Sequence, residues 1–184
     1  MRRTRTRPSA FARLGRTAYD SRVMAYSVVY TVDVTAPPSR VFDYVADVSR
    51  HGEWASADDH MKAIAEKPGQ PAIGSRYKAE GISFGSSRPA RTLNRKPAQS
   101  VVTITALEAS KRLAFDAEGA NWVFHHEFTF SPSAGGTHVE RHVTMTKGPF
   151  YFPILLSISK GTVQKNYNGA MANLKSKLES SGGR

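Results

Sequence analysis

The sequence contains no cysteine among its 184 residues. Thiol catalysis, disulfide bonds and cysteine-ligated zinc are therefore excluded. The chain also lacks a glycine-rich phosphate loop, a nucleophile elbow and a helical zinc-binding motif, each of which marks a familiar class of nucleotide-binding or hydrolytic protein. Because none of these signatures is present, we expect no bound cofactor. No apolar run in the sequence is long enough to cross a bilayer as a helix.

Acidic residues are few relative to basic ones: 15 Asp and Glu stand against 26 Lys and Arg, a formal net charge of +11. More than half of this charge lies in residues 1–23, which hold seven arginines and a single acid, Asp20. The rest of the chain carries only +5. The excess is therefore a property of an N-terminal tail. Without aromatic interleaving or a base-reading motif, it does not indicate specific nucleic-acid binding.

The chain length suits one domain. We predict a basic disordered tail at residues 1–24, a folded domain at 25–181 and a short disordered tail at 182–184. Three interpretations of the N-terminal tail stay open: an organelle transit peptide, an arm in weak contact with an anionic surface, or an extension without a dedicated role. Because the tail lacks the apolar run of a secretory signal, the predicted location is the cytoplasm, with an organelle as the alternative.

Seven segments have the composition of β-strands. The first, at residues 26–35, alternates at a period of two and ends where Pro37 and Pro38 interrupt it. Its apolar face consists of Val28, Tyr30, Val32 and Val34. The other six are expected at residues 61–67, 74–84, 100–108, 112–118, 122–131 and 137–147. The sequence "SPSAGG" between the last two predicts a β-hairpin, and the loop at residues 85–99 is rich in proline and arginine.

Two helical regions are expected, one after the first strand and one at the C-terminal end. The double proline suits a first helical turn, and the apolar residues of the short helix that follows are Val41, Phe42, Val45 and Val48. A second short helix or turn is expected at residues 49–59. A long C-terminal helix, irregular near Gly161, has the apolar face Val163, Tyr167, Ala170, Met171, Leu174 and Leu178. We interpret the apolar run "YFPILLSIS" before it as core packing, with a membrane-touching or pocket-gating lip as the alternative.

The order of strand, two short helices, six strands and a long helix suits one antiparallel sheet with the helix against its concave face. The segment "VDVTAPPSRVFDYVADVSRHGEW" resembles the opening of the START-like (helix-grip, Bet v 1-like) superfamily, in its polyketide cyclase/dehydrase and lipid-transport (SRPBCC) group. Later segments that resemble this group are "GSRY", "VTITALEASKRLAF", "FTFSPSAGGTHVE" and "NGAMANLKSKLE". The usual proline after the fourth strand is replaced by Ala109, and the loop at residues 85–99 is longer than usual.

The resemblance, which covers residues 26–180, implies an α+β helix-grip fold. In this fold a seven-stranded antiparallel sheet wraps around the long C-terminal helix, two short helices follow the first strand, and an internal apolar cavity lies between sheet and helix. Cavities of this kind bind apolar or amphipathic small molecules such as lipids and polyketides. Since members share shape rather than chemistry, the function has to be read from the residues of the cavity itself.

The best candidate pair lies on the last two strands. In "NWVFHHEFTF" the alternation predicts an inner face formed by Trp122, Phe124, His126, Phe128 and Phe130. Arg141 shares the apolar face of the next strand, and a turn centred on Ser133 and Ala134 would place it opposite His126. A buried arginine stays charged and needs an acceptor, while burial and a neighbouring cation lower the pKa of a histidine.

Two interpretations of His126 and Arg141 stay open. The pair could orient a carboxylate, phenolate or enolate of a ligand, with His126 as a candidate catalytic base in an aldol-type cyclisation. Alternatively, His126 bonds a core hydroxyl and Arg141 pairs with an interior carboxylate. The predicted ligand-binding residues are His126, Arg141, Tyr77, Trp122, Phe124, Phe128 and Tyr167.

Three further residue groups bear on the site. Asn166 is a second helical residue that could face the cavity. Trp54 is expected to seal the corner between sheet and helix, as the resemblance implies, with a place at the mouth of the cavity as the alternative. His125 and His142 are expected to lie opposite each other on the outer face of the sheet. Because they lack a clear third ligand, we predict no metal site.

Three hypotheses of function follow from the sequence. The first is binding or transport of a hydrophobic or amphipathic small molecule in the cavity. The second is a cyclase, aromatase or dehydratase that acts on a polyketide-like substrate in the same cavity. The third is an interaction protein that acts through the basic tail and the basic residues of the loop at 88–96.

Overall fold

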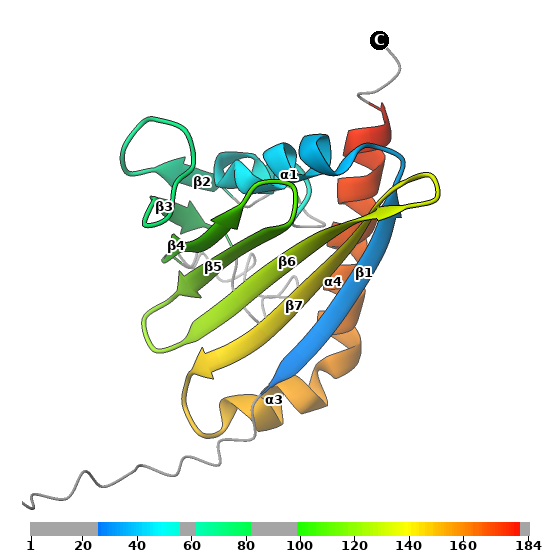
Figure 1. The fold of residues 1–184 in the computed structure, drawn as a ribbon. Helices are drawn as coiled ribbons and strands as arrows, with labels where there is room; N and C mark the ends of the chain where they lie inside the picture. The colour runs from blue at the N-terminus through cyan, green and yellow to red at the C-terminus, as the bar shows by residue number, and fades with distance from the viewer. Residues whose placement is uncertain (1–25, 56–61, 82–98, 181–184) are drawn as a thin grey trace, which may run out of the picture.

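The computed structural model describes residues 26–55, 62–81 and 99–180 (Figure 1). The predicted tails and most of the loop at residues 85–99 lie outside the described residues. The strands are β1 (Ser27–Val34), β2 (Lys62–Ala65), β3 (Arg76–Glu80), β4 (Gln99–Glu108), β5 (Arg112–Glu118), β6 (Val123–Ser133) and β7 (Gly136–Lys147). The helices are α1 (Pro38–Ala46), the 3₁₀ helix η1 (Val48–Glu53), α3 (Phe152–Ile158) and α4 (Lys160–Ser180).

The seven strands form one antiparallel sheet in the order β1-β7-β6-β5-β4-β3-β2. The sheet curves around α4, which runs along its concave side, and α1 covers one end (Figure 1). Each long strand buries alternate side chains toward α4, because successive side chains of a strand point to opposite faces. The predicted α+β helix-grip fold is confirmed.

The sequence between β1 and α1 follows from the two prolines. Pro37 has an extended backbone, with φ −65° and ψ 150°, and Pro38 occupies the first helical turn, where a missing N–H removes no helical hydrogen bond. Behind this corner, Trp54 is fully buried and packs edge-on against Phe128 at a centroid distance of 6.1 Å. The predicted role of Trp54 in sealing the corner is confirmed.

The C-terminal helical region is two helices rather than one. The break falls at Ser159, between α3 and α4, so the irregularity predicted at Gly161 lies two residues earlier, and Gly161 is part of α4. Within α3 only Pro153 and Leu156 are buried, so the predicted core packing of this apolar run is wrong for most of its side chains. Among the described residues, no helix is both long enough and apolar enough to span a membrane.

The end of α4 is tied to the end of β1 by Glu179 and Lys175. The Glu179 carboxylate accepts hydrogen bonds from the Thr35 backbone N–H at 2.9 Å and from Lys175 Nζ at 2.8 Å. Lys175 Nζ also donates to the Asp33 carbonyl at 2.7 Å. The Lys175 ammonium and then the Thr35 N–H lower the pKa of Glu179 to about 2.

This carboxylate should leave a signature in acid. Since the pKa of Glu179 is lower in the folded chain than the roughly 4.3 of a free glutamate, its stabilisation is complete above that value and is lost as the pH falls toward 2. We expect Glu179→Gln to lower the urea midpoint at pH 7 and to have almost no effect near pH 2. The same substitution at the exposed Glu118 is the control. A difference that stays constant across the pH range would contradict the assignment.

Candidate ligand-binding site

The inner faces of β6 and β7 supply the centre of the candidate site. Phe124, His126, Phe128 and Phe130 are buried on β6, and Val139, Arg141, Val143 and Met145 are buried on β7. This assignment of the inward residues agrees with the alternation of the sequence. It brings a histidine and an arginine into a mostly apolar face, where a polar group is costly unless it has a partner.

The register of the hairpin differs from the prediction by two residues on β7. Arg141 lies opposite Phe128, and His126 lies opposite Val143. The turn consists of Ala134 and Gly135, because Ser133 pairs with Gly136. Gly136 has a φ of +155°, and a Cβ at this position would come within 2.1 Å of the Val34 carbonyl oxygen, so only glycine fits here.

Arg141 and His126 nevertheless touch, as diagonal neighbours on the same face of the sheet. Nη2 of Arg141 lies 3.2 Å from Nδ1 of His126. Since a guanidinium can only donate, Nδ1 accepts, and the neutral imidazole carries its proton on Nε2. Burial, and then the Arg141 charge, hold the pKa of His126 well below its usual value. His126 is therefore a neutral imidazole at physiological pH.

Aromatic rings surround the Arg141 guanidinium. Its Cζ lies 4.8 Å from the centroid of Tyr167, 5.0 Å from that of Phe128 and 5.9 Å from that of Trp54. Tyr30 pairs with Arg141 across β1 and β7, and its ring stacks on Tyr167 at 4.7 Å. Rings at these distances stabilise a cation through its charge but satisfy none of its N–H groups.

Arg141 has no acidic partner in the described part of the chain. The side chain is only 6% exposed, yet none of the salt bridges among the described residues includes it. The alternative in which Arg141 pairs with an interior carboxylate therefore has no support there. Burial lowers the pKa of Arg141, but a guanidinium is too strong a base to lose its proton in a protein.

Three buried donors in this region lack a partner, and we call them the donor cluster: Nε and Nη1 of Arg141 and Nε1 of Trp54. Within the described residues no other buried side-chain nitrogen or oxygen is unpaired. Each unmet buried donor costs about 1–3 kcal/mol, and more when the group is charged. All three atoms donate, so the site is short of a hydrogen-bond acceptor.

His51 is a neighbour of the site that the sequence analysis missed. It lies in η1, is 2% exposed, and its Nε2–H donates to the Val45 carbonyl at 2.8 Å. Its ring packs 4.8 Å from Trp54 and 5.5 Å from Phe115. Burial lowers the pKa of His51 to about 4, and the Arg141 charge acts in the same direction. The spacing of three residues from Trp54, one helical turn, was the signal that could have found it.

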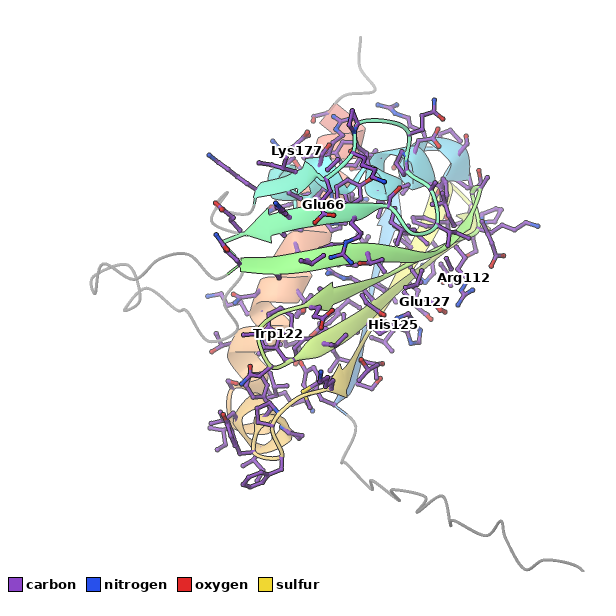
Figure 2. The ribbon with its side chains drawn as sticks, turned by 90° about the vertical axis from the view of Figure 1, so that its left-hand side faces the viewer. Glu66, Arg112, Trp122, His125, Glu127 and Lys177 are labelled. Atoms are coloured by element: carbon purple, nitrogen blue, oxygen red, sulfur yellow. The ribbon has the colours of Figure 1, made fainter. Side chains whose placement is uncertain are left out.

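The remaining candidates lie farther away. Phe124 is fully buried. Trp122 lies in the turn between β5 and β6 (Figure 2), is half-buried, and packs against Phe124 with the ring centroids 5.5 Å apart. Tyr77 is buried on the same face but on β3, four strands from the β7 strand that carries Arg141. Asn166 is exposed, so the prediction that it could face the interior is wrong, whereas Tyr167 does reach Arg141.

Two surface hollows in the described part of the chain are lined by residues other than Arg141, Trp54 and His126. One lies beside Lys175 at the tip of the β6–β7 hairpin, and the other lies at the turn between β2 and β3. The internal apolar cavity therefore stays a prediction. The donor cluster is a covered group of side chains between the sheet and α4.

The outer face of the sheet carries paired charges. Arg112 binds Glu127 at 2.6 Å and His125 binds Asp116 at 2.7 Å, and Figure 2 shows Arg112, Glu127 and His125 along neighbouring strands. The predicted pairing of His125 with His142 is wrong, because His125 lies opposite Thr144 and His142 opposite Glu127. Within the described ranges no three His, Asp or Glu side chains are grouped to hold a metal ion.

Comparisons with known proteins agree with this architecture. A family model described as "Polyketide cyclase / dehydrase and lipid transport" matches residues 25–179. No curated protein matches the chain in sequence. Among solved structures, a protein from Chromobacterium violaceum is 14% identical with a TM-score of 0.59, over 84% of this chain and 98% of that one.

Two further structures are similar to this chain. A protein from Thermus thermophilus is 15% identical with a TM-score of 0.60, over 85% of this chain and 98% of that one. The di-domain ARO/CYC StfQ from the steffimycin biosynthetic pathway is 12% identical with a TM-score of 0.62, over 87% of this chain and 52% of that one. At such low identity, the likeness to these structures establishes the fold alone.

Proposed function

The chain belongs to the polyketide cyclase/dehydrase and lipid-transport family, and on that premise we propose that it binds an apolar or amphipathic small molecule whose oxygen acceptor meets the donor cluster. The observation that carries the proposal is the unmet hydrogen-bonding capacity of Arg141 and Trp54. A carboxylate, phenolate or enolate would supply the missing charge and acceptor together. Such a group binds an arginine more strongly than a neutral oxygen does.

The surroundings of the donor cluster suit the apolar part of such a ligand. Phe128, Phe115 and Tyr167 present ring faces and edges around the guanidinium and the His126 imidazole. Small-molecule sites typically combine predominantly apolar walls with a few convergent polar groups. Lipids and polyketides, the molecules in the family's description, have this mixed character.

The alternative function is a cyclase, aromatase or dehydratase that uses the same residues. The neutral His126 beside a cation favours it, as does the similarity to a di-domain ARO/CYC. However, the one basic lone pair of the imidazole, on Nδ1, is directed at Arg141, and Nε2 carries the proton. His126 could act as a base only after Arg141 moves or the proton changes nitrogen, so the geometry favours binding over proton transfer.

A third function, through the basic tail and the loop at 88–96, involves residues that lie outside the described ranges. It stays a hypothesis. It does not draw on the donor cluster.

Binding is tested with an acid and its ester. We expect native mass spectrometry to show a co-purified small molecule, and the emptied protein to bind palmitate about 10–100-fold more tightly than methyl palmitate, since a charge-assisted bond contributes about 1.5–3 kcal/mol. Binding of palmitate and of methyl palmitate is measured by the quenching of tryptophan fluorescence, to which the buried Trp54 contributes. In Arg141→Met the acid should lose its advantage while the ester binds as before.

The matched control is Arg112→Met on the outer face, where the arginine already has Glu127 and Glu108 as partners. This variant should keep the preference for the acid. Equal affinity for palmitate and methyl palmitate in the wild-type protein would contradict the proposed role of Arg141. Turnover of a polyketide-like substrate that disappears in His126→Ala, with binding retained, would favour the enzyme alternative.

A further inference from the structure

The described surface carries an unusual concentration of exposed apolar side chains at α3. Eight large hydrophobic residues are exposed among the described residues, and five of them fall within the nine positions from 150 to 158. We call these five the α3 face: Phe150, Tyr151, Ile154, Leu155 and Ile158. Phe150 is 88% exposed and Ile158 is 80% exposed. Single exposed apolar residues need no explanation, but a contiguous group of this kind marks an interaction site.

The spacing shows that the α3 face is one side of a helix. Tyr151, Ile154, Leu155 and Ile158 follow the i, i+3, i+4, i+7 pattern of a single helical stripe. The opposite side of α3 buries Pro153 and Leu156 against the domain. The helix is therefore apolar on two sides, and only one of them has a partner within the described chain.

The few polar groups of α3 are satisfied within the helix. The hydroxyl of Ser157 donates to the Pro153 carbonyl at 2.8 Å, and that of Ser159 donates to the Leu155 carbonyl at 2.6 Å. Neither hydroxyl needs water as an acceptor. Such internal bonding is what side chains require when a helix surface enters a medium with few hydrogen-bond partners.

The charges on the segment that carries the α3 face are all of one sign. From position 142 to position 178 the sequence contains no Asp or Glu. The exposed lysines Lys147 and Lys160 flank α3 directly, and the exposed Lys165 lies in the next turns of α4. A partner that covers this face must therefore tolerate apolar contact at its centre and supply negative charge around it.

The arginine-rich segment joins the domain at the same end. The described chain begins at Tyr26, whose carbonyl accepts a hydrogen bond from the Met145 N–H at 2.9 Å. Figure 1 shows that β1 begins and β7 ends at the end of the sheet where α3 lies. The described chain, which follows a segment with seven arginines and one acid at residues 1–23, therefore begins at the end of the domain that carries the α3 face.

We propose that the α3 face docks on an anionic lipid bilayer. Its apolar side chains would enter the boundary between headgroups and acyl chains, and Lys147, Lys160 and Lys165 would contact acidic headgroups, as in amphipathic helices that lie in the interface plane. A second copy of the chain fits the face less well, because a two-fold contact through α3 would bring the two sets of lysines together. The proposal goes beyond ligand binding and does not depend on which ligand is bound.

The test is co-sedimentation of the full chain with vesicles. We expect binding to vesicles of phosphatidylcholine with about 30% phosphatidylserine to be at least about tenfold tighter than to phosphatidylcholine alone, and to weaken as salt is added. The double variant Ile154→Glu/Leu155→Glu should lower the affinity about tenfold or more, because it places charge in the apolar stripe. Both positions are more than half exposed, so the variant should keep the wild-type circular dichroism and urea midpoint.

The control is Ile64→Glu on β2, where an isoleucine is 65% exposed at the far edge of the sheet. It should bind vesicles as the wild type does. Binding that survives the double α3 variant would assign membrane contact to another part of the chain and overturn the proposal. Suppose that the wild type does not bind vesicles, sediments as a dimer, and becomes a monomer in the double α3 variant. Sedimentation velocity would then identify the face as a contact between copies instead, and the proposal would be overturned.

Discussion

Replacing Arg141 with methionine is expected to raise the free energy of unfolding of the ligand-free protein by about 1–4 kcal/mol, the range found when buried ion pairs are replaced by apolar side chains of similar volume. Arg141 is 6% exposed, and two of its nitrogens have no partner. Its contacts with Phe128, Tyr167 and Trp54 and its bond to His126 offset only part of the loss of hydration. Methionine keeps the contacts with the rings and removes the charge. Urea unfolding at pH 7 measures the change.

Arg112→Met is the matched control for this prediction. Arg112 is paired on the outer face and its side chain is 40% exposed, so water screens its ion pairs and its loss should lower the stability only slightly. Arg141→Met should therefore be the only one of the two that stabilises. A loss of several kcal/mol in Arg141→Met would instead mean that the guanidinium has an acceptor in the folded chain, and the case for an acidic ligand would fall with it.

The two effects of Arg141→Met have a single cause. An arginine that destabilises the empty protein and binds the acidic group of a ligand is kept for binding rather than for folding. A ligand that binds only the folded state stabilises it in proportion to its concentration and affinity. Saturating palmitate should therefore stabilise the wild-type protein more than it stabilises the Arg141→Met variant. The difference in free energy of unfolding between the two proteins should then narrow or change sign.

Acidification from pH 7 to pH 4 is expected to lower the free energy of unfolding by about 3 kcal/mol through His51. The pKa of His51 is about 4 in the folded protein and about 6.5 in an unfolded chain. Between these two pKa values His51 is protonated in the unfolded chain but not in the folded chain, so the free energy of unfolding decreases as the pH is lowered. The pKa of His126 is lowered in the same direction. Urea unfolding midpoints, measured at half-unit steps between pH 7.5 and pH 4, check this decrease in stability.

His51→Gln isolates this contribution. The amide can still donate to the Val45 carbonyl, as Nε2 of His51 does, but it does not titrate. The variant should lose less stability between pH 7 and pH 4 than the wild type, and the remaining slope should reflect His126. The Glu179 effect begins only below about pH 4.3, so the two pH ranges overlap only at the acid end of the series. An unchanged slope in His51→Gln would show that His51 takes up its proton in the folded state.

The periodic parts of the fold could be predicted from the chain. The strand expected at residues 112–118 is β5 with the same bounds, and the inward positions of His126 and Arg141 are as the alternation predicts. Both rest on alternation at a period of two, which is a property of neighbouring residues. The low pKa of His126 also follows, since it needs only burial and a nearby cation.

Predictions fail where they require a choice between local alternatives. Two glycines follow each other in "SPSAGG", so several two-residue turns are compatible with the sequence, and the position of Gly136 against Val34 selects one. His51 belongs to a stretch that reads as a polar turn, although its ring packs on Trp54. The apolar run at α3 reads as core because composition does not reveal which side of a helix finds a partner.

The sequence by itself determined the order of the strands and helices, the faces they bury and the charge of the N-terminal segment, because each depends on residues a few positions apart. Only the tertiary structure decided that Arg141 meets Trp54, Phe128 and Tyr167 but no described carboxylate, and that the α3 face is left uncovered. Whether a side chain lacks a partner depends on every element that packs around it. For Arg141 this is decided only when β7, η1 and α4 have packed together, and the proposed function rests on its missing acceptor.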